Sequence, residues 1–173
     1  MKKLAVIGAS MAILVAVAVV AFQPSHDHGS VTTPTAFDLP ALTGSGRVML
    51  RAYQGKPVVV NLFASWCTEC LTELPAFARA AHDLSGKVQF IGVDSMETGD
   101  GRGMATRFKL AAAGFVLARD VGPGGSGLHD AIHAPGMPAT IFYDAEGRIL
   151  GRDIAAVPES LLRTQLQQYY GVS

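Results

Sequence analysis

The sequence is short of cysteine, of tryptophan and of net charge. Its 173 residues contain two cysteines, one tryptophan and 14 acidic against 14 basic residues. Without a basic excess or an acidic run, nothing indicates a nucleic-acid surface or a solvated charged tail. Apolar residues make up 49% of the chain. That share argues against a disordered protein and favours one domain of ordinary size with a real core.

One long stretch of the chain lacks charge altogether. Residues 4–22 form an apolar run of 19 residues behind Lys2 and Lys3, which is near the length that crosses a bilayer. Small-residue sites ending at Ala18 and Ala21 are also typical of cleavage by signal peptidase. We predict a membrane anchor or a signal peptide over residues 1–22, and both alternatives export the rest of the chain.

The next segment, residues 23–35, is polar and contains Pro24, Gly29 and Pro34. This composition indicates a flexible linker. His26 and His28 lie in it, but two histidines on a flexible chain make a poor metal site. The folded domain is therefore expected over residues 36–173, with no repeat and no second domain.

Strand and helix patterns alternate along that domain. The apolar run Val58–Phe63 predicts a strand buried on both faces. A helical pattern follows over residues 71–84, with a kink expected at Pro75. We also predict edge strands at 37–40 and 47–53, strands at 88–93, 115–117, 139–143 and 148–152, and helices at 104–113, 128–132 and after Pro158. This order indicates an α/β fold, a mixed central sheet with helices on both faces.

Both cysteines lie where the buried strand meets the helix, in the run Cys67-Thr68-Glu69-Cys70. A C-x-x-C pair in that place is typical of a thioredoxin-like redox site. Free N–H groups and the dipole of the helix would stabilise a thiolate there. Cys67 would attack a partner disulfide, and Cys70, expected to be more buried, would resolve the mixed disulfide. The same pair can oxidise, and spacing does not set the direction.

The two cysteines have other possible interpretations. A structural disulfide across so short a loop would add little stability. Half of a zinc site would need a second pair of ligands. His129 and His133, at the spacing of one helical turn, lie far along the chain and fit solvated or capping histidines better than a metal pair. Two inert thiols in an exported chain with no other cysteine are the remaining alternative.

The segment from Val59 to Cys70, with Glu73 and Pro75, resembles the extracytoplasmic TlpA/ResA-like thioredoxin family. The runs 37–40, 53–57 and 136–144, with Gly147, are similar to that family too. Together they span roughly residues 36–170, so the resemblance covers the whole expected domain and implies a thioredoxin-like fold.

The resemblance implies roles for several side chains. Trp66 would shield the disulfide, and Pro138 would be a cis proline facing it. The backbone of Met137 would then be free to pair with a substrate strand. Glu73 would be the acid that handles protons during exchange, with a plain exposed helix glutamate as the alternative. Asn61 occupies the place of the buried aspartate of cytoplasmic thioredoxins, which leaves proton handling to Glu73.

Two features depart from the family pattern. The dipeptide Thr68-Glu69 lacks the proline common before the second cysteine, and we hypothesise that Glu69 disfavours the thiolate and makes the pair more reducing. Ala139 stands where the cytochrome-c-maturation branch typically has glutamate, which weakens assignment to that branch.

The sequence therefore predicts an exported thiol–disulfide oxidoreductase at the periplasmic or outer face of the cell membrane, most simply a reductase. Its redox group would be the Cys67–Cys70 disulfide, with no other cofactor and no metal. Expected partners are disulfide-containing exported proteins, in cytochrome c maturation or copper-centre assembly, and a membrane electron donor of DsbD/CcdA type. The alternatives are a copper metallochaperone that uses both thiolates, and a disulfide oxidase or isomerase.

Overall fold

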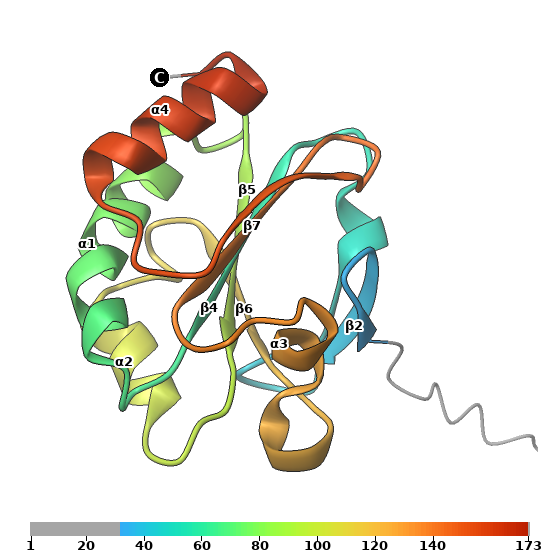
Figure 1. Cartoon of the computed structure of the whole chain (residues 1–173), viewed down its shortest axis with the longest axis vertical. Coiled ribbons are helices and arrows are strands. Elements are labelled where there is room, and N and C mark those ends of the chain that lie inside the picture. Colours follow the sequence, from blue (N-terminus) through green and yellow to red (C-terminus); the bar gives the residue numbers. More distant parts are fainter. Residues whose placement is uncertain (1–31, 173) are drawn as a thin grey trace, which may run out of the picture.

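The protein is described by a computed structural model that places residues 32–172. A five-stranded mixed sheet lies at its centre, in the order β6-β5-β4-β7-β8 (Figure 1). The strands are β4 (Val58–Phe63), β5 (Gln89–Asp94), β6 (Phe115–Arg119), β7 (Ala139–Tyr143) and β8 (Ile149–Asp153). β4, β5 and β6 run parallel, whereas β7 and β8 are antiparallel to their neighbours. The predicted mixed sheet is confirmed.

One face of the sheet is covered by helices α1 (Thr68–Asp83), α2 (Gly101–Arg107) and α4 (Glu159–Tyr170). The opposite face is covered by α3 (Gly127–Ala131) and by a small antiparallel sheet of β1 (Thr32–Thr33), β2 (Ala36–Pro40) and β3 (Arg47–Met49). Figure 1 shows the two layers on either side of the central strands. Helices thus lie on both faces, but on the second face a strand layer provides most of the cover.

All six residues of β4 are buried, as the continuous apolar run predicts. Val59 and Phe63 pack in the core under α1, while Val58, Val60 and Leu62 pack in the core on the other face. Successive side chains of a strand point to opposite faces, so Asn61 points to the α1 face. One buried polar side chain is thereby placed directly beneath the helix that carries the cysteines.

The helix predicted at 104–113 is wrong at both ends, because α2 spans Gly101–Arg107. It begins early since the Asp100 side chain accepts a hydrogen bond from the Gly103 N–H at 2.7 Å and caps the helix. It ends early since Lys109 adopts a positive φ of 54°, which an α-helix does not allow. Turns fill the rest of the way to Phe115.

The edge strand predicted at 47–53 is also only half right. Its second half forms a 3₁₀ turn, η1 (Leu50–Tyr53), in which Leu50 is buried. The remaining boundaries agree within a few residues, and β7 matches the prediction at both ends. α1 runs unbroken through Pro75.

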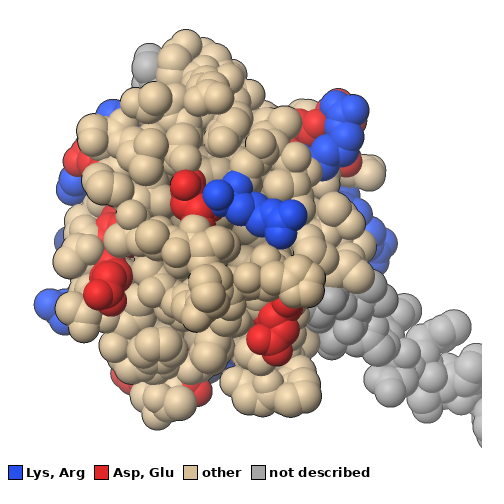
Figure 2. Space-filling model, in the orientation of Figure 1, with Lys and Arg blue, Asp and Glu red and all other residues tan. Residues whose placement is uncertain are grey.

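β1 lies within the segment that the sequence predicts as a linker, because Thr32 and Thr33 pair with β2. The predicted anchor or signal segment, residues 1–22, lies outside the described residues. Among residues 32–172, none of the helices has the length and apolar character needed to cross a bilayer. Acidic and basic side chains are scattered over the face in Figure 2, with no broad patch of one sign.

Candidate active site

The cysteines are positioned by the turn between β4 and α1. Ala64, Ser65 and Trp66 follow the end of β4, and Cys67 is the N-cap residue of α1 in an extended conformation. The Cys67 N–H donates to the Ala64 carbonyl at 3.1 Å. This turn brings Cys67 to the helix N-terminus, where the dipole and free N–H groups favour negative charge on sulfur.

Cys67 and Cys70 are joined in a disulfide. The Cys67 sulfur also accepts a hydrogen bond from the Cys70 N–H at 3.1 Å. Cys67 is 2% exposed and Cys70 is fully buried, so the expected order of burial is present but small. A reduced Cys67 thiolate would keep the same backbone donor, which is the group that stabilises it.

Glu73 lies one helical turn beyond Cys70 and is buried. Its Oε1 accepts from Asn61 Nδ2 at 2.7 Å, and its Oε2 accepts from the Val157 N–H at 2.8 Å. The same Asn61 nitrogen donates to Thr140 Oγ1 at 3.1 Å. The alternative of an exposed helix glutamate is therefore wrong, because Asn61 and Val157 enclose the carboxyl group beneath α1.

Burial raises the pKa of Glu73 to about 7, with the Asp153 charge adding to it, while the hydrogen bonds from Val157 and Asn61 act in the opposite direction. A carboxyl group with a pKa near neutrality can both accept and release a proton at working pH. Glu73 also lines a cavity of about 360 Å³ that lies between α1 and the 156–159 segment. Water in that cavity would give the carboxyl group a route for proton exchange.

Three of the predicted side chains lie on the surface around the disulfide. Trp66 is 48% exposed, and its indole N–H donates to the Met96 carbonyl at 2.8 Å. Thr68 and Glu69 are exposed in the first turn of α1. The predicted shielding role of Trp66 and the tuning role of Thr68 and Glu69 remain predictions.

The Met137–Pro138 peptide bond is cis, as the resemblance implies. Pro138 is buried next to Ala139, which pairs with Leu62 near the end of β4. Met137 packs against the core cluster that contains both cysteines. The loop before β7 therefore ends at the same edge of the sheet as the disulfide, and pairing of Met137 with a substrate strand remains a prediction.

A group of polar side chains at the end of β5 was not predicted from the sequence. Asp94 pairs in register with Phe63, so the loop after β5 emerges beside the turn that leads to Cys67. There the backbone N–H and the hydroxyl group of Ser65 each donate a hydrogen bond to one oxygen of the Glu97 carboxylate. The sequence feature that could have indicated this group is the run of polar residues directly after β5. Because β5 is parallel to β4, the carboxyl ends of both strands lie at the same edge of the sheet.

His129 was also misjudged, because it is buried and its Nε2 lies 3.2 Å from the Gly136 carbonyl. His133 is exposed with a positive φ of 53°, so the two histidines do not form a pair on one helix face. Within residues 32–172 no cluster of three or more His, Cys, Asp or Glu side chains has the geometry to hold a metal ion.

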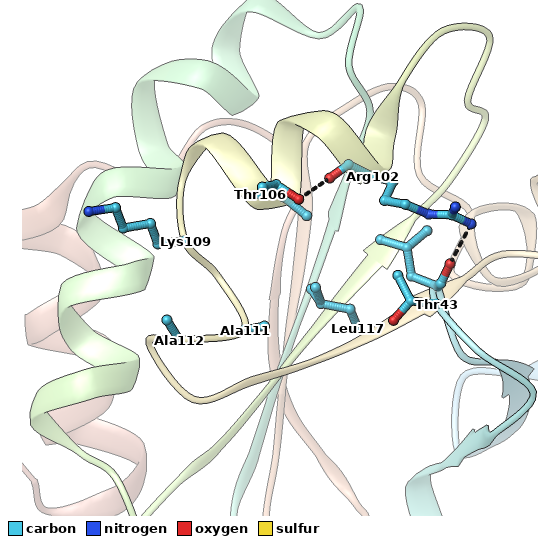
Figure 3. Close-up of a pocket in the computed structure, with 9 residues that line it drawn as sticks. Thr43, Arg102, Thr106, Lys109, Ala111, Ala112 and Leu117 are labelled. Atoms are coloured by element: carbon cyan, nitrogen blue, oxygen red, sulfur yellow. Dashed lines mark hydrogen bonds between the residues drawn. The ribbon is translucent and has the colours of Figure 1, made fainter.

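A further cavity of about 300 Å³ lies between α2, the 109–112 segment and Leu42-Thr43. Its lining is mainly apolar, and Arg102 donates to the Leu42 carbonyl at its rim (Figure 3). None of the predicted site residues lines it.

A protein-family model for the AhpC/TSA family matches residues 32–151. The chain belongs to the AhpC/TSA family. This match covers the disulfide, Glu73 and the cis-proline loop, and it ends before Val157, which donates to Glu73.

Curated relatives share the same chemistry. Thiol:disulfide interchange protein DsbE of Pseudomonas fluorescens biotype C is 28% identical over 137 residues, which are 78% of this chain and 72% of that protein. Thiol:disulfide interchange protein CycY of Rhizobium leguminosarum bv. viciae is 31% identical over 112 residues, 65% of this chain and 54% of that protein. With the disulfide at the start of α1, they identify this AhpC/TSA member as a thiol–disulfide oxidoreductase.

Solved structures agree on the fold. A secreted Mycobacterium tuberculosis disulfide oxidoreductase, homologous to E. coli DsbE, superposes with a TM-score of 0.62 at 22% identity. The match covers 78% of this chain and 97% of that structure. The thioredoxin-like fold is confirmed. Together with the family match and the DsbE relative, it confirms the resemblance to TlpA/ResA-like oxidoreductases.

Proposed function

We propose that this protein reduces disulfides of exported proteins, with Cys67 as nucleophile, Cys70 as resolving thiol and Glu73 as proton carrier. The observation that carries the proposal is the buried Glu73 carboxyl group, held behind Cys70 by Asn61 and Val157. An oxidoreductase that passes electrons in pairs must also move protons. Glu73 is the buried carboxyl group on α1, one turn beyond Cys70.

The exchange proceeds in two steps. The Cys67 thiolate attacks one sulfur of a substrate disulfide, forms a Cys67–substrate disulfide, and releases the other substrate sulfur as a thiolate that takes up a proton. Cys70 then loses its proton to the Glu73 carboxylate and attacks the Cys67 sulfur. This step forms the Cys67–Cys70 disulfide and releases the second substrate sulfur as a thiolate, which takes up the proton that Glu73 received from Cys70. The substrate gains two electrons and two protons, and the protein becomes the oxidised form seen here.

The reducing direction is supported by the charges around the pair. Above pH 7 Glu73 is ionised, and a negative charge behind Cys70 disfavours the thiolate. Glu69, in the first turn, would act in the same direction as a second acid beside the thiols. A pair whose thiolate is poorly stabilised is a stronger reductant, because a stabilised reduced form is what makes an oxidant.

The setting follows from the sequence and the relatives. The apolar segment over residues 4–22 would export the domain or tether it outside the cytoplasm, where surroundings are oxidising. A reductase there needs electrons from the membrane, and a DsbD/CcdA-type transporter has the chemistry to supply them. The thiol:disulfide interchange relatives support disulfide-containing proteins as substrates. The resemblance to the TlpA/ResA-like family suggests the haem-binding cysteines of apocytochrome c, with copper-centre assembly proteins as the second class.

The test uses the full chain, reduced and then mixed with a model protein disulfide such as insulin. We expect rapid reduction by the wild type, none by Cys67→Ala, and a trapped mixed disulfide with Cys70→Ala. Equilibration with glutathione should give a potential nearer to about −270 mV, the thioredoxin value, than to about −120 mV, the DsbA value. A potential at the DsbA end would instead identify an oxidase, and undiminished activity of Cys67→Ala would overturn the mechanism.

A further inference from the structure

The loop after β5, residues 96–100, is hydrogen-bonded to Ser65 and Trp66, the two residues just before Cys67. Glu97 Oε2 accepts from the Ser65 N–H at 2.7 Å, and Glu97 Oε1 accepts from the Ser65 hydroxyl at 2.6 Å. The Ser65 hydroxyl oxygen in turn accepts from the Asp100 N–H at 3.1 Å. The next residue, Trp66, donates from its indole to the Met96 carbonyl at 2.8 Å. Both residues between β4 and Cys67 that leave the core are therefore tied to residues 96–100.

The contact between the two segments is close because the backbone at Gly99 lies against the Ser65 side chain. A Cβ atom added at Gly99 would lie 2.7 Å from the Ser65 hydroxyl oxygen, far inside normal contact. The Gly99 N–H also donates to Glu97 Oε1 at 2.5 Å. Three donors therefore converge on one carboxylate, and charge-assisted hydrogen bonds of this kind are the stronger class.

A second carboxyl group lies beside Glu97. Asp94 ends β5, is 5% exposed, and its Oδ1 has no hydrogen-bond partner in the described part of the chain. Both acids line a cavity of about 250 Å³ with Asp100, Arg102 and Arg119. The charged groups that face Asp94 are thus Glu97 and Asp100 from its own loop, Arg102 from α2 and Arg119 from β6.

We propose that Glu97 is a positioning residue for thiol–disulfide exchange, and that the charge on Asp94 sets how firmly Glu97 holds Ser65 and, through Ser65, the adjacent Trp66. The proposal rests on the function proposed above, because the segment it positions leads directly to the nucleophile Cys67. Ser65 and Trp66 are one and two residues from Ala64, whose carbonyl receives the Cys67 N–H.

The direction of the effect follows from charge. Burial and the adjacent Glu97 raise the pKa of Asp94 to about 7, while Arg119 opposes this shift. The hydrogen bonds from Ser65 and Gly99 outweigh burial and lower the pKa of Glu97. Below pH 7 Asp94 is neutral, and Glu97 is the charged member of the pair. The hydrogen bonds between Glu97 and Ser65 are then at their strongest. Above pH 7 the two adjacent carboxylates repel each other, and the hydrogen bonds between Glu97 and Ser65 weaken.

The first test removes the carboxylate. We expect Glu97→Ala to slow the reaction of reduced protein with insulin roughly tenfold at pH 6, because small displacements of a nucleophile carry large rate penalties. Glu97→Gln, which keeps an acceptor for Ser65, should recover part of the rate. Glu146→Gln is the matched control, since it removes a carboxylate from the turn at the opposite end of β7 and should leave the rate unchanged.

The readout that separates positioning from stability is the fluorescence of Trp66, the only tryptophan in the chain. Glu97→Ala should shift its emission to longer wavelength while the protein remains folded by circular dichroism. If Glu97 acts through Ser65, the rate effect of Glu97→Ala should shrink in a Ser65→Ala background. Additive effects of the two changes would contradict a path through Ser65.

The second test follows Trp66 emission with pH in the oxidised protein, whose disulfide does not titrate. The wild type should show a transition near pH 7 that disappears in Asp94→Asn and persists in Glu73→Gln. A transition that survives Asp94→Asn, or an absent transition in the wild type, overturns the role of Asp94. Unchanged rate and emission in Glu97→Ala overturn the role of Glu97. Either result leaves the proposed function intact, whereas activity of Cys67→Ala removes that function by itself.

Discussion

Two buried carboxyl groups lie near the turn and the helix that carry the redox pair, and their surroundings differ. Glu73, beneath α1, has both oxygens satisfied by Asn61 and Val157. Asp94, at the end of β5, has an unpartnered Oδ1 and the Glu97 carboxylate beside it. The pKa of each is raised to about 7, mainly by burial. Similar pKa values therefore arise at one carboxyl group held by neutral donors and at another that faces a second acid.

This difference assigns different work to the two groups. Glu73 is hydrogen-bonded by two groups that stay neutral, and the Asp153 charge is the smallest of the influences on its pKa, which suits proton transfer. Asp94 titrates against a charge, so its proton changes the interaction with Glu97 and, through Glu97, the position of Ser65. The first group is suited to carry protons, and the second is suited to sense pH.

The largest expected effect is on the pH dependence of stability in Glu73→Gln. The pKa of Glu73 rises from an ordinary 4.5 to about 7 in the folded state. The folded protein then holds a proton that the unfolded chain releases between pH 4.5 and pH 7, so stability falls as pH rises through that window. At about 1.4 kcal/mol per pH unit, roughly 3 kcal/mol is involved.

Denaturant unfolding at pH 4.5 and pH 8 measures this change in the free energy of unfolding. Glu73→Gln should lose less stability across that range than the wild type, by roughly 3 kcal/mol. Rotation of the Asn61 amide lets its unpartnered Oδ1 accept from the new amide, which preserves the network. An equal loss in variant and wild type would show that Glu73 does not titrate in this range.

A middle-sized effect is expected where α2 packs on Asp94. A Cβ atom at Gly101 would collide with the Asp94 carboxylate, so Gly101→Ala must displace the start of α2 or the acid. We expect a loss of about 2 kcal/mol in the free energy of unfolding, measured at pH 6. Gly136→Ala is the control, because a Cβ there meets nothing within 4 Å. Equal stability of the two variants would mean that Asp94 has room to move.

The smallest effect is expected for Asp94→Asn. Although Asp94 is only 5% exposed, its carboxyl group lines a cavity with Arg102 and Arg119. The Arg119 charge, together with water in that cavity, reduces the free energy that the titration of Asp94 contributes. Stability should still fall with rising pH in the wild type, between pH 3.8 and pH 7. The variant should recover about 1 kcal/mol of that loss at pH 8. A recovery as large as that of Glu73→Gln would erase the contrast between the two sites.

The sequence predicted the redox pair because its evidence is local. A buried strand, a C-x-x-C pair and a helical pattern lie within a few residues of one another, and strand period and helix period are readable there. Glu73 was identified through the resemblance, but its burial was not, because Val157 lies 84 residues further along the chain. Glu97 was missed for a similar reason, since Ser65 is 32 residues away. The ends of α2 were also mispredicted, because they depend on the Asp100 cap and on the positive φ of Lys109, which the apolar pattern does not reveal.

The open edge of the central sheet has a consequence for how partners approach. β6 at one edge is bridged by Ala41 to the β2–β3 layer, whereas β8 at the other edge pairs only with β7 among the described strands. β8 carries Arg152 and Asp153, and its register with β7 shifts at Phe142. Charges and irregular register both discourage another extended chain from adding to an edge. We therefore expect the β8 edge to resist the addition of another extended chain, and the predicted pairing of a substrate strand with Met137 would then have no competing site at that edge.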